Sequence, residues 1–318
     1  MTPVQKGILS LIIANVIWGF ASPIFKWSLG NIPPFTLAFL RFFIATILLG
    51  IVFRKKLTMP INDKHDLRLL IFYTLTSITG NITFFFLGLA LTLAINVPVI
   101  ASSQPIMVFL FAYLFLKEKF MWKKIIGMIV GTIGILIIVL EPIYYAGIDG
   151  NALGNFYIVI ATICGSVGML IGRKIFQKYD PFTLIFWAFA IGAISFLPPA
   201  IIEYIKQPNL YAQIDIRGII GILFGGVFSS GVAYALSSYG LSKITASEAS
   251  LFVYIDPIAG TVLAYFMLHE PITTPFIIGA VFIFLGIYIA ERRIHYHPFA
   301  KLRKISCPDC PQPASKTP

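Results

Sequence analysis

The sequence predicts an all-α integral membrane protein in which ten transmembrane helices form two five-helix repeats of inverted topology. Three observations lead to this fold class: an apolar composition, ten long apolar stretches and an internal duplication. Of the 318 residues, 58% are hydrophobic and 12% are charged, and the mean hydropathy is +0.88. A soluble domain typically has about 25% charged residues. The composition therefore indicates a polytopic membrane protein without a soluble domain of useful size.

Ten apolar stretches are long enough to cross a bilayer. A hydrocarbon core about 30 Å thick requires about 20 mostly apolar residues in a helix. The predicted spans are residues 8–27, 35–53, 68–91, 95–116, 122–140, 152–172, 181–203, 217–240, 246–268 and 275–292. The first span continues past any small-residue cleavage site into Pro23 and Lys26, so we expect it to be retained and not removed as a signal peptide.

An internal duplication is clearest around two prolines. Pro105–Glu118 aligns without a gap on Pro257–Glu270, 152 residues later. The same register extends to glycines beyond this segment, which pair as Gly127 with Gly279 and Gly134 with Gly286. Repeats of this kind decide the architecture before any local feature does. We therefore divide the chain into an N-terminal tail (1–7), a first repeat (8–142), a second repeat (143–293) and a C-terminal tail (294–318).

The basic residues are distributed asymmetrically. If the N-terminus is cytoplasmic and every span crosses the membrane, 20 of the 24 Lys and Arg residues fall in cytoplasmic segments. This excess follows the positive-inside rule, which predicts a multi-pass protein of the cytoplasmic membrane with both termini in the cytoplasm. Topology thereby explains the formal net charge of +11, and we expect no nucleic-acid partner. Because each repeat has an odd number of spans, the second repeat must insert upside down.

Polar residues occur within the first and third spans. Asn15 and Trp18 lie in the first span, and Asn81 follows Gly80 in the third, which these two residues interrupt. Polar side chains within a span usually face the bundle interior or a water-filled cavity. The eighth span contains three glycines, at positions 225, 226 and 231, which we expect to serve close helix packing.

Two cations also lie within spans. Lys26 is near the end of the first span, and Arg173 takes the equivalent place in the second repeat when Pro34 is aligned with Pro181, 147 residues later. Arg41 lies about six residues, or about 9 Å of helix, from the start of its span. Its side chain could extend to the outer interface or face an internal cavity, and the sequence leaves both options open.

Asp256 is the most unusual residue of the ninth span. It lies near the middle of the span, about 15 Å from either end. A carboxylate at that depth costs several kcal/mol unless it is paired, hydrated or protonated. Pro257 follows it and removes a backbone donor. Glu248, Phe252 and Asp256 share one helical stripe, so both acids could face one vestibule.

The fourth span carries amides where the ninth carries acids. The alignment of the repeats places Asn96 opposite Glu248 and Gln104 opposite Asp256, with Ser102 close to Gln104. The two repeats would therefore offer amide groups from one side of a central site and carboxyl groups from the other.

These duplicated motifs at these spacings carry a family resemblance. The motifs that carry the resemblance are Trp18-Gly19 with Lys26 downstream, Arg41-Phe42 with Ala45, and the repeated Pro, Glu and Gly series. Over about residues 8–292 the chain resembles EamA-type ten-helix permeases of the drug/metabolite transporter superfamily. The resemblance implies a central cavity lined mainly by spans 1, 3, 4, 6, 8 and 9, and export of small metabolites, amino acids or drug-like compounds. Similar proteins often carry Glu where this chain has Asp256, which keeps the acid but shortens its reach by a methylene.

We accordingly expect a secondary transporter that works by alternating access, with protons as a candidate coupling ion. The expected substrate-binding residues are Asn15, Trp18, Asn81, Ser102, Gln104, Tyr234, Phe252, Tyr254 and Asp256. Asp256 and Glu248 are the candidate proton-coupling carboxylates. The alternative for Asp256 is a structural pair with Lys26, Arg41 or a tyrosine. Glu118 and Glu270, at helix ends, are expected to have an interfacial or capping role.

Two rival functions have weaker support. A phosphorylated-sugar or nucleotide-sugar exchanger of the same fold would need several cations in the cavity, where only Lys26 and Arg41 are available. A membrane-embedded enzyme would need catalytic groups, but the four histidines lie in loops or the tail, and neither HExxH nor GxSxG occurs. We therefore expect no catalytic residue, no cofactor and no metal site within the spans.

The C-terminal tail leaves one question about metal open. Two His and two Cys could complete a tetrahedral zinc site, although their spacing is not that of a standard finger and nearby prolines favour disorder; they are His295, His297, Cys307 and Cys310. The other expected partners are a small-molecule substrate and the lipid bilayer. Whether the chain forms a homodimer is not decided by the sequence.

Overall fold

The computed structural model describes most of the chain as helices. It covers residues 2–53, 61, 63–104, 106–108, 110–111, 122–146, 150–176, 178–241, 243, 252 and 254–291. Six helical stretches are long and apolar enough to cross a membrane, by length and composition: Pro3–Leu29, Pro34–Val52, Lys64–Leu91, Asn151–Gly172, Phe182–Lys206 and Ile216–Ser237. Shorter apolar helices occupy Ile125–Glu141, Ile255–Leu268 and Thr274–Gly286.

The elements follow the predicted spans closely. In the first repeat they are α1 (Pro3–Leu29), α2 (Pro34–Val52), α3 (Lys64–Tyr73), η2 (Thr74–Gly80), α4 (Asn81–Leu91), α5 (Asn96–Ala101) and α7 (Trp122–Ala146). In the second repeat they are α8 (Gly150–Phe176), α9 (Pro181–Lys206), α10 (Pro208–Ala212), α11 (Ile216–Leu223), η3 (Phe224–Val232), α12 (Ala233–Leu241), α14 (Ile255–Leu268) and α15 (Thr274–Glu291). Among the elements of the described residues, only the short α10, between two spans, has no counterpart in the prediction. Parts of the predicted fourth and ninth spans lie outside the described residues.

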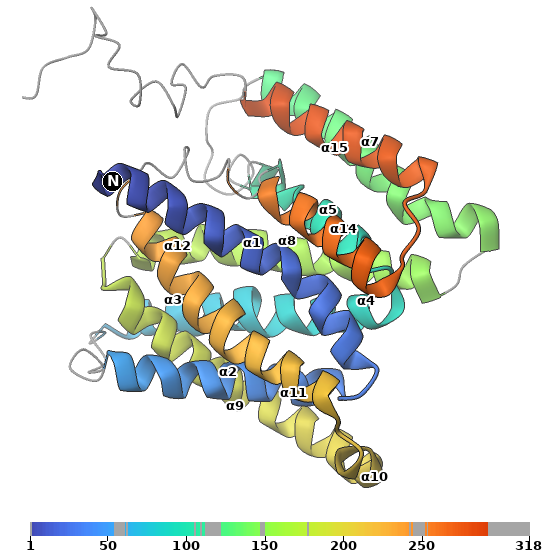
Figure 1. Ribbon diagram of the computed structural model, residues 1–318. Coiled ribbons are helices and arrows are strands. Elements are labelled where there is room, and N and C mark those ends of the chain that lie inside the picture. Colours follow the sequence, from blue (N-terminus) through green and yellow to red (C-terminus); the bar gives the residue numbers. More distant parts are fainter. Residues whose placement is uncertain are drawn as a thin grey trace, which may run out of the picture.

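The helices pack in pairs that repeat when the two halves are exchanged. Helix α1, which opens the first repeat, packs on α14 and α12, and α8, which opens the second, packs on α5 and α4. Helix α2 packs on its counterpart α9, and α7 packs on its counterpart α15 along one edge of the molecule (Figure 1). This pairing is what a duplicated bundle requires, and it confirms the predicted fold class.

The third and eighth spans both contain a π-helical segment. These segments are η2 (Thr74–Gly80) and η3 (Phe224–Val232), and adding the repeat distance of 152 to the first gives residues 226–232. A π-helix widens the turn, interrupts the regular hydrogen-bond ladder and is frequent at functional sites. Close packing is present as well, because a Cβ added to Gly226 would lie 2.7 Å from Cγ2 of Ile44. Glycine here serves both the packing and the wider turn.

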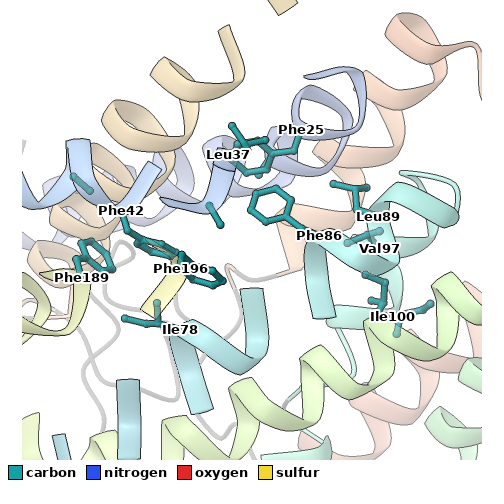
Figure 2. Packing of buried hydrophobic residues seen from close by; sticks show 14 of the residues in the cluster. Phe25, Leu37, Phe42, Ile78, Phe86, Leu89, Val97, Ile100, Phe189 and Phe196 are labelled. Carbon is teal, nitrogen blue, oxygen red and sulfur yellow. The ribbon is translucent and has the colours of Figure 1, made fainter. Parts of the chain in front are cut away.

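Aromatic residues fill the space between the helices of the core. Figure 2 shows Phe25 beside Phe86, and a second group in which Phe42 lies against Phe189 and Phe196. The ring centroids of Phe25 and Phe86 are 5.3 Å apart, and those of Phe42 and Phe196 are 5.9 Å apart in a stacked arrangement. These contacts join α1 to α4 and α2 to α9, so the core spans both repeats.

Glycines that align between the repeats bring α7 and α15 into backbone contact. A Cβ added to Gly134 would lie 2.5 Å from the carbonyl oxygen of Gly279, and one added to Gly286 would lie 2.5 Å from that of Gly127. Small residues allow helices in lipid to approach this closely. The close packing of α7 on α15 therefore explains why glycines occur at equivalent positions in the two repeats.

This contact predicts that Gly286→Ala destabilises the protein. The added methyl would push against the backbone of α7, and overpacking of this kind costs about 1–3 kcal/mol. Thermal unfolding of the purified protein in detergent should show a lower midpoint. Gly30→Ala is the matched control, because a Cβ at Gly30 meets only the Trp27 carbonyl at 3.5 Å and the residue has ordinary right-handed backbone angles. Equal midpoints for the two variants would contradict the backbone contact.

Candidate substrate site

One polar group joins α1 to the eighth span. The indole Nε1 of Trp18 donates to the backbone carbonyl of Ser229, at 3.0 Å, and its ring lies edge-on to Tyr234 with centroids 5.3 Å apart. Ser229 lies within η3, and a π-helical turn makes backbone carbonyls available to groups outside the helix. Both rings are half-buried, so they offer partly accessible aromatic surface in the middle of the bundle.

Asp256 lies where α14 crosses α1. A Cβ added to Gly19 would lie 2.6 Å from the backbone oxygen of Asp256 and 2.8 Å from Cβ of Ala259, so the two helices are in backbone contact there. Gly260 extends the contact, because a Cβ on it would lie 2.9 Å from the carbonyl oxygen of Gly19. The backbone of Asp256 is thereby in contact with the first span.

Three oxygen atoms at this crossing have no hydrogen-bond partner within the described part of the chain. They are Oδ1 of Asn15, Oγ of Ser22 and Oδ1 of Asp256, and all three are buried. Asn15 is about one turn before Gly19 on α1 and Ser22 about one turn after it. Buried polar atoms are nearly always bonded, and leaving one unbonded costs about 1–3 kcal/mol. The crossing is therefore a place where a bound donor would stabilise the protein.

Arg41 is bonded away from Asp256. Its Nε donates to Oγ of Ser230 at 2.8 Å, its Nη2 donates to Oγ of Ser229 at 3.2 Å, and its guanidinium lies 5.2 Å from the ring centroid of Phe25. The side chain is only 5% exposed. Extension of Arg41 to the membrane interface, one of the two options left by the sequence, is therefore excluded, because the serines of η3 hold the guanidinium inside the bundle.

Lys26 is also bonded away from Asp256. Its Nζ donates to the backbone carbonyls of Leu89, Ala90 and Thr92 at 2.8, 3.0 and 2.8 Å. Over the described residues, neither cation is therefore paired with Asp256, and the structural pairing with Lys26 or Arg41 that we considered is not observed.

A second polar group lies at the equivalent place in the other repeat. Asn81 on α4 and Gln104 in the fourth span both approach Gly165 of α8, since a Cβ there would lie 3.0 Å from Nδ2 of Asn81 and 3.5 Å from Nε2 of Gln104. Asn81 also donates to the Ala161 carbonyl at 2.7 Å. By the repeat alignment, Gly165 corresponds to Trp18 and Gln104 to Asp256. The structure thus brings two of the predicted residues, the amides Asn81 and Gln104, together at α8. In the other group, Trp18 directly precedes Gly19, the residue that contacts the backbone of Asp256.

The other predicted site residues are placed less centrally. Ser102 is buried, and its hydroxyl donates to the Val99 carbonyl of its own helix at 2.6 Å. Tyr254 precedes α14 and lies edge-on to Phe284, with centroids 6.1 Å apart. Phe252 is half-buried. Glu248 and the His and Cys residues of the tail lie outside the described residues.

A third polar feature, which was not predicted as part of the site, is the connection between α4 and α5 (residues 92–95). Glu270 accepts from the backbone N–H of Ala94 at 2.8 Å and from that of Ile95 at 2.9 Å, which confirms the capping role expected for this acid. Burial raises the pKa of the Glu270 carboxyl, and these two N–H bonds and the charge of Lys26 oppose the rise. Glu118, its partner in the duplication, lies outside the described residues. The repeated Glu was the one signal from which this contact could be found.

Within the described residues, no group of three His, Cys, Asp or Glu side chains is placed to hold a metal ion. A pocket of about 290 Å³ lies elsewhere, between the α1–α2 turn and the end of α9. Its one acid, Glu203, already accepts from the backbone N–H groups of Phe35 and Thr36 at the start of α2, at 3.0 and 2.7 Å. The polar groups in the bundle centre are therefore the better candidate for the substrate site.

Comparison with solved structures supports the same fold. A crystal structure of a protein 18% identical to this chain superposes with a TM-score of 0.62, over 92% of this chain and 98% of that one. At this identity the likeness concerns the fold alone.

Comparison with known sequences identifies the family. An uncharacterized transporter of Archaeoglobus fulgidus is 30% identical over 91% of this chain and 100% of its own length. The uncharacterized transporter YoaV of Bacillus subtilis is 26% identical over 89% and 96%, and the chloroplastic WAT1-related protein At3g02690 of Arabidopsis thaliana is 24% identical over 88% and 68%. The EamA-like transporter family profile matches residues 5–140 and 152–291, once in each half of the chain. The chain therefore belongs to the EamA-like transporter family, as a multi-pass membrane transporter and not an enzyme.

Proposed function

We propose that the protein is a secondary transporter that exports small metabolites, amino acids or drug-like compounds by alternating access, coupled to protons through Asp256. The observation that carries the proposal is the set of three unbonded buried oxygens where α14 crosses α1. A substrate ammonium or a proton on the carboxyl would supply the missing donor. In the proposed topology both termini are cytoplasmic, the membrane is the cytoplasmic membrane, and residues 8–142 and 143–293 are the two moving repeats.

The packing of the two repeats supports alternating access. Helices α1 and α14 come from different repeats and meet at the site, and so do α8 and α5. Transporters built from inverted repeats commonly place the substrate at the repeat interface and expose it to each side in turn by moving one repeat against the other. The two polar groups lie on these interfaces and would change their separation in such a movement.

Proton coupling is supported by the chemistry around Asp256. An ionised carboxylate in this position is costly, because the neighbouring unbonded atoms on α1 include the carbonyl oxygen of Asn15, which cannot donate. Protonation removes the charge and gives the carboxyl a hydroxyl donor. A substrate with an ammonium group would satisfy the same atoms, so proton and substrate would compete for one site.

The neutral aromatic and amide groups favour an amphipathic organic substrate. Trp18 and Tyr234 offer ring faces or edges, and Asn81 and Gln104 offer amides. The phosphorylated-sugar or nucleotide-sugar alternative would need free cations, but Lys26 and Arg41 already donate to protein groups. Phosphate binding would have to break those bonds, and it therefore ranks second.

Uptake into proteoliposomes tests the proposal directly. A panel of amino acids and aromatic cations is offered with and without a pH gradient, and empty liposomes provide the baseline. We expect saturable flux of at least one compound that accelerates with the gradient, because substrate and proton share a site. Saturable flux with the same rate with and without the pH gradient would refute proton coupling, and non-saturating flux would indicate a channel.

Asp256→Asn should remove the response of this flux to the gradient. The amide keeps the size and a donor but takes up no proton, so the gradient-driven component should fall by about tenfold, equivalent to about 1.4 kcal/mol. Flux without a gradient should persist. Asp256→Glu is the matched control, since it retains a titratable acid and should retain the response. A full response in Asp256→Asn would show that another group carries the proton.

Trp18→Ala should weaken substrate binding. The change removes the bond to Ser229 and the contact with Tyr234, and we expect KM for an aromatic substrate to rise about tenfold, equivalent to about 1.4 kcal/mol. Trp187→Ala is the control, because it removes the same side chain from a different helix, α9, where Trp187 contacts Phe186. A similar rise in KM for both variants would place Trp18 in the packing of the bundle and not in the site.

A further inference from the structure

The connection between α4 and α5 is held at both ends by charged side chains from other elements. On one side, the ammonium of Lys26 donates to the carbonyls of Leu89, Ala90 and Thr92 at the end of α4. On the other side, the carboxylate of Glu270 accepts from the N–H groups of Ala94 and Ile95 at the start of α5. Two side chains therefore make five hydrogen bonds to the backbone where α4 ends and α5 begins.

These bonds replace caps that the connection itself does not supply. Ile95 is the N-cap residue of α5 and has no side chain that can cap it, and α4 ends in an apolar Leu91. The last carbonyls and first N–H groups of a helix have no partner within that helix. Lys26 and Glu270 supply partners for these groups on the two sides of the connection.

The two side chains come from different repeats. Lys26 is near the end of α1. After α14 ends at Leu268, His269 has a left-handed conformation with φ 54° and ψ 33°, and Glu270 follows it. That conformation is uncommon for a residue other than glycine and turns the chain directly into Glu270. Glu270 is 7% exposed, whereas Lys26 remains half-buried. The connection is thus bonded at once to α1 of the first repeat and to the α14–α15 turn of the second.

We infer that Lys26 and Glu270 form a latch that keeps the substrate site closed on the face predicted to be extracellular. The inference rests on the alternating access proposed above. Opening that face requires the ends of α1, α4–α5 and α14 to separate, and they cannot do so while both side chains hold the same four-residue connection. The latch and the site share the same two helices, since α1 carries Ser22 and Lys26 one turn apart, and α14 carries Asp256 and leads to Glu270.

The duplication supports a mobile contact and not only a static cap. Lys26 and Glu270 have the sequence equivalents Arg173 and Glu118, which keep a cation and an acid and are predicted near the cytoplasmic face. A transporter that closes its extracellular and cytoplasmic faces in turn could use one such cation and acid at each end of the bundle. The side chains of Arg173 and Glu118 lie outside the described residues, so this step rests on sequence equivalence.

Cysteine labelling tests the latch. In a background with Cys164, Cys307 and Cys310 replaced by serine, Ser22→Cys places a thiol one helical turn inside Lys26. A membrane-impermeant maleimide is then applied to right-side-out and to inside-out vesicles. Lys26→Met and Glu270→Gln each weaken one half of the latch. Labelling from the predicted extracellular face should rise by about tenfold in either variant, the change expected for about 1.4 kcal/mol of lost bonding.

Two variants distinguish a latch from a general loss of stability. Glu203→Gln weakens another carboxylate cap, formed by Glu203 of α9 on the N–H groups of Phe35 and Thr36 of α2, without touching the connection. Lys26→Arg keeps the cation, as Arg173 does in the other repeat. Both should label within about twofold of the parent, below 0.5 kcal/mol.

The outcomes separate the latch from the transport proposal. An unchanged labelling rate in Lys26→Met and Glu270→Gln, or an equal rise in Glu203→Gln, would overturn the latch even in a parent that transports. A rise confined to the two latch variants and to one face would support it, whatever the proteoliposome flux of the parent. Absence of saturable flux in the parent would instead count against the proposed function.

Discussion

A helix leaves the N–H groups of its first turn and the C=O groups of its last turn without a partner in that helix, and the arrangement of this bundle depends on how these groups are satisfied. Lys26 and Glu270 bond the two sides of the α4–α5 connection, and Glu203 bonds the start of α2. Trp18 bonds a carbonyl of η3. Each of these side chains belongs to a different element from the backbone it bonds. The same contacts that satisfy the backbone therefore also join helices to one another: α1 and the α14–α15 turn both bond to the segment that links α4 and α5.

The duplicated scaffold carries a site that is not symmetric. Glycines at equivalent positions make the α7–α15 contact from both sides, which ties these residues to the packing of both repeats. At the candidate site the equivalent positions differ: the indole at 18 corresponds to a glycine at 165, and the acid at 256 corresponds to an amide at 104. A symmetric frame moves in two equivalent directions, whereas an asymmetric site can bind one end of a substrate differently from the other. The divergence of these few positions is therefore where specificity for a substrate would arise.

The fold could be predicted from the sequence because its signals are local or periodic. Apolar length gives the spans, and the gapless 152-residue register gives the duplication. The bonds across the bundle could not be predicted in this way. Arg41 was compatible with an interfacial position until the serines of η3 were seen to hold it, and Glu203 caps a helix that lies 167 residues earlier in the chain. Glu270 was the exception, because its repetition at a helix end already indicated a cap. Contacts between distant segments leave no pattern in a single sequence unless duplication records them.

The energetics of the α4–α5 connection explain how bonds to buried charges can also be exchanged. A hydrogen bond to a charged group contributes about 1.5–3 kcal/mol when its alternative is a bond to water. Five such bonds would fix the connection permanently if opening exposed it to lipid. Opening toward an aqueous face instead exposes it to water, which can bond the same carbonyls and N–H groups, so only the net difference opposes the movement. A ligand shifts such an equilibrium only through its different affinity for the two states. A donor bound at the α1–α14 crossing would have that property, because the unbonded oxygens it satisfies lie on the two helices whose ends Lys26 and Glu270 hold together.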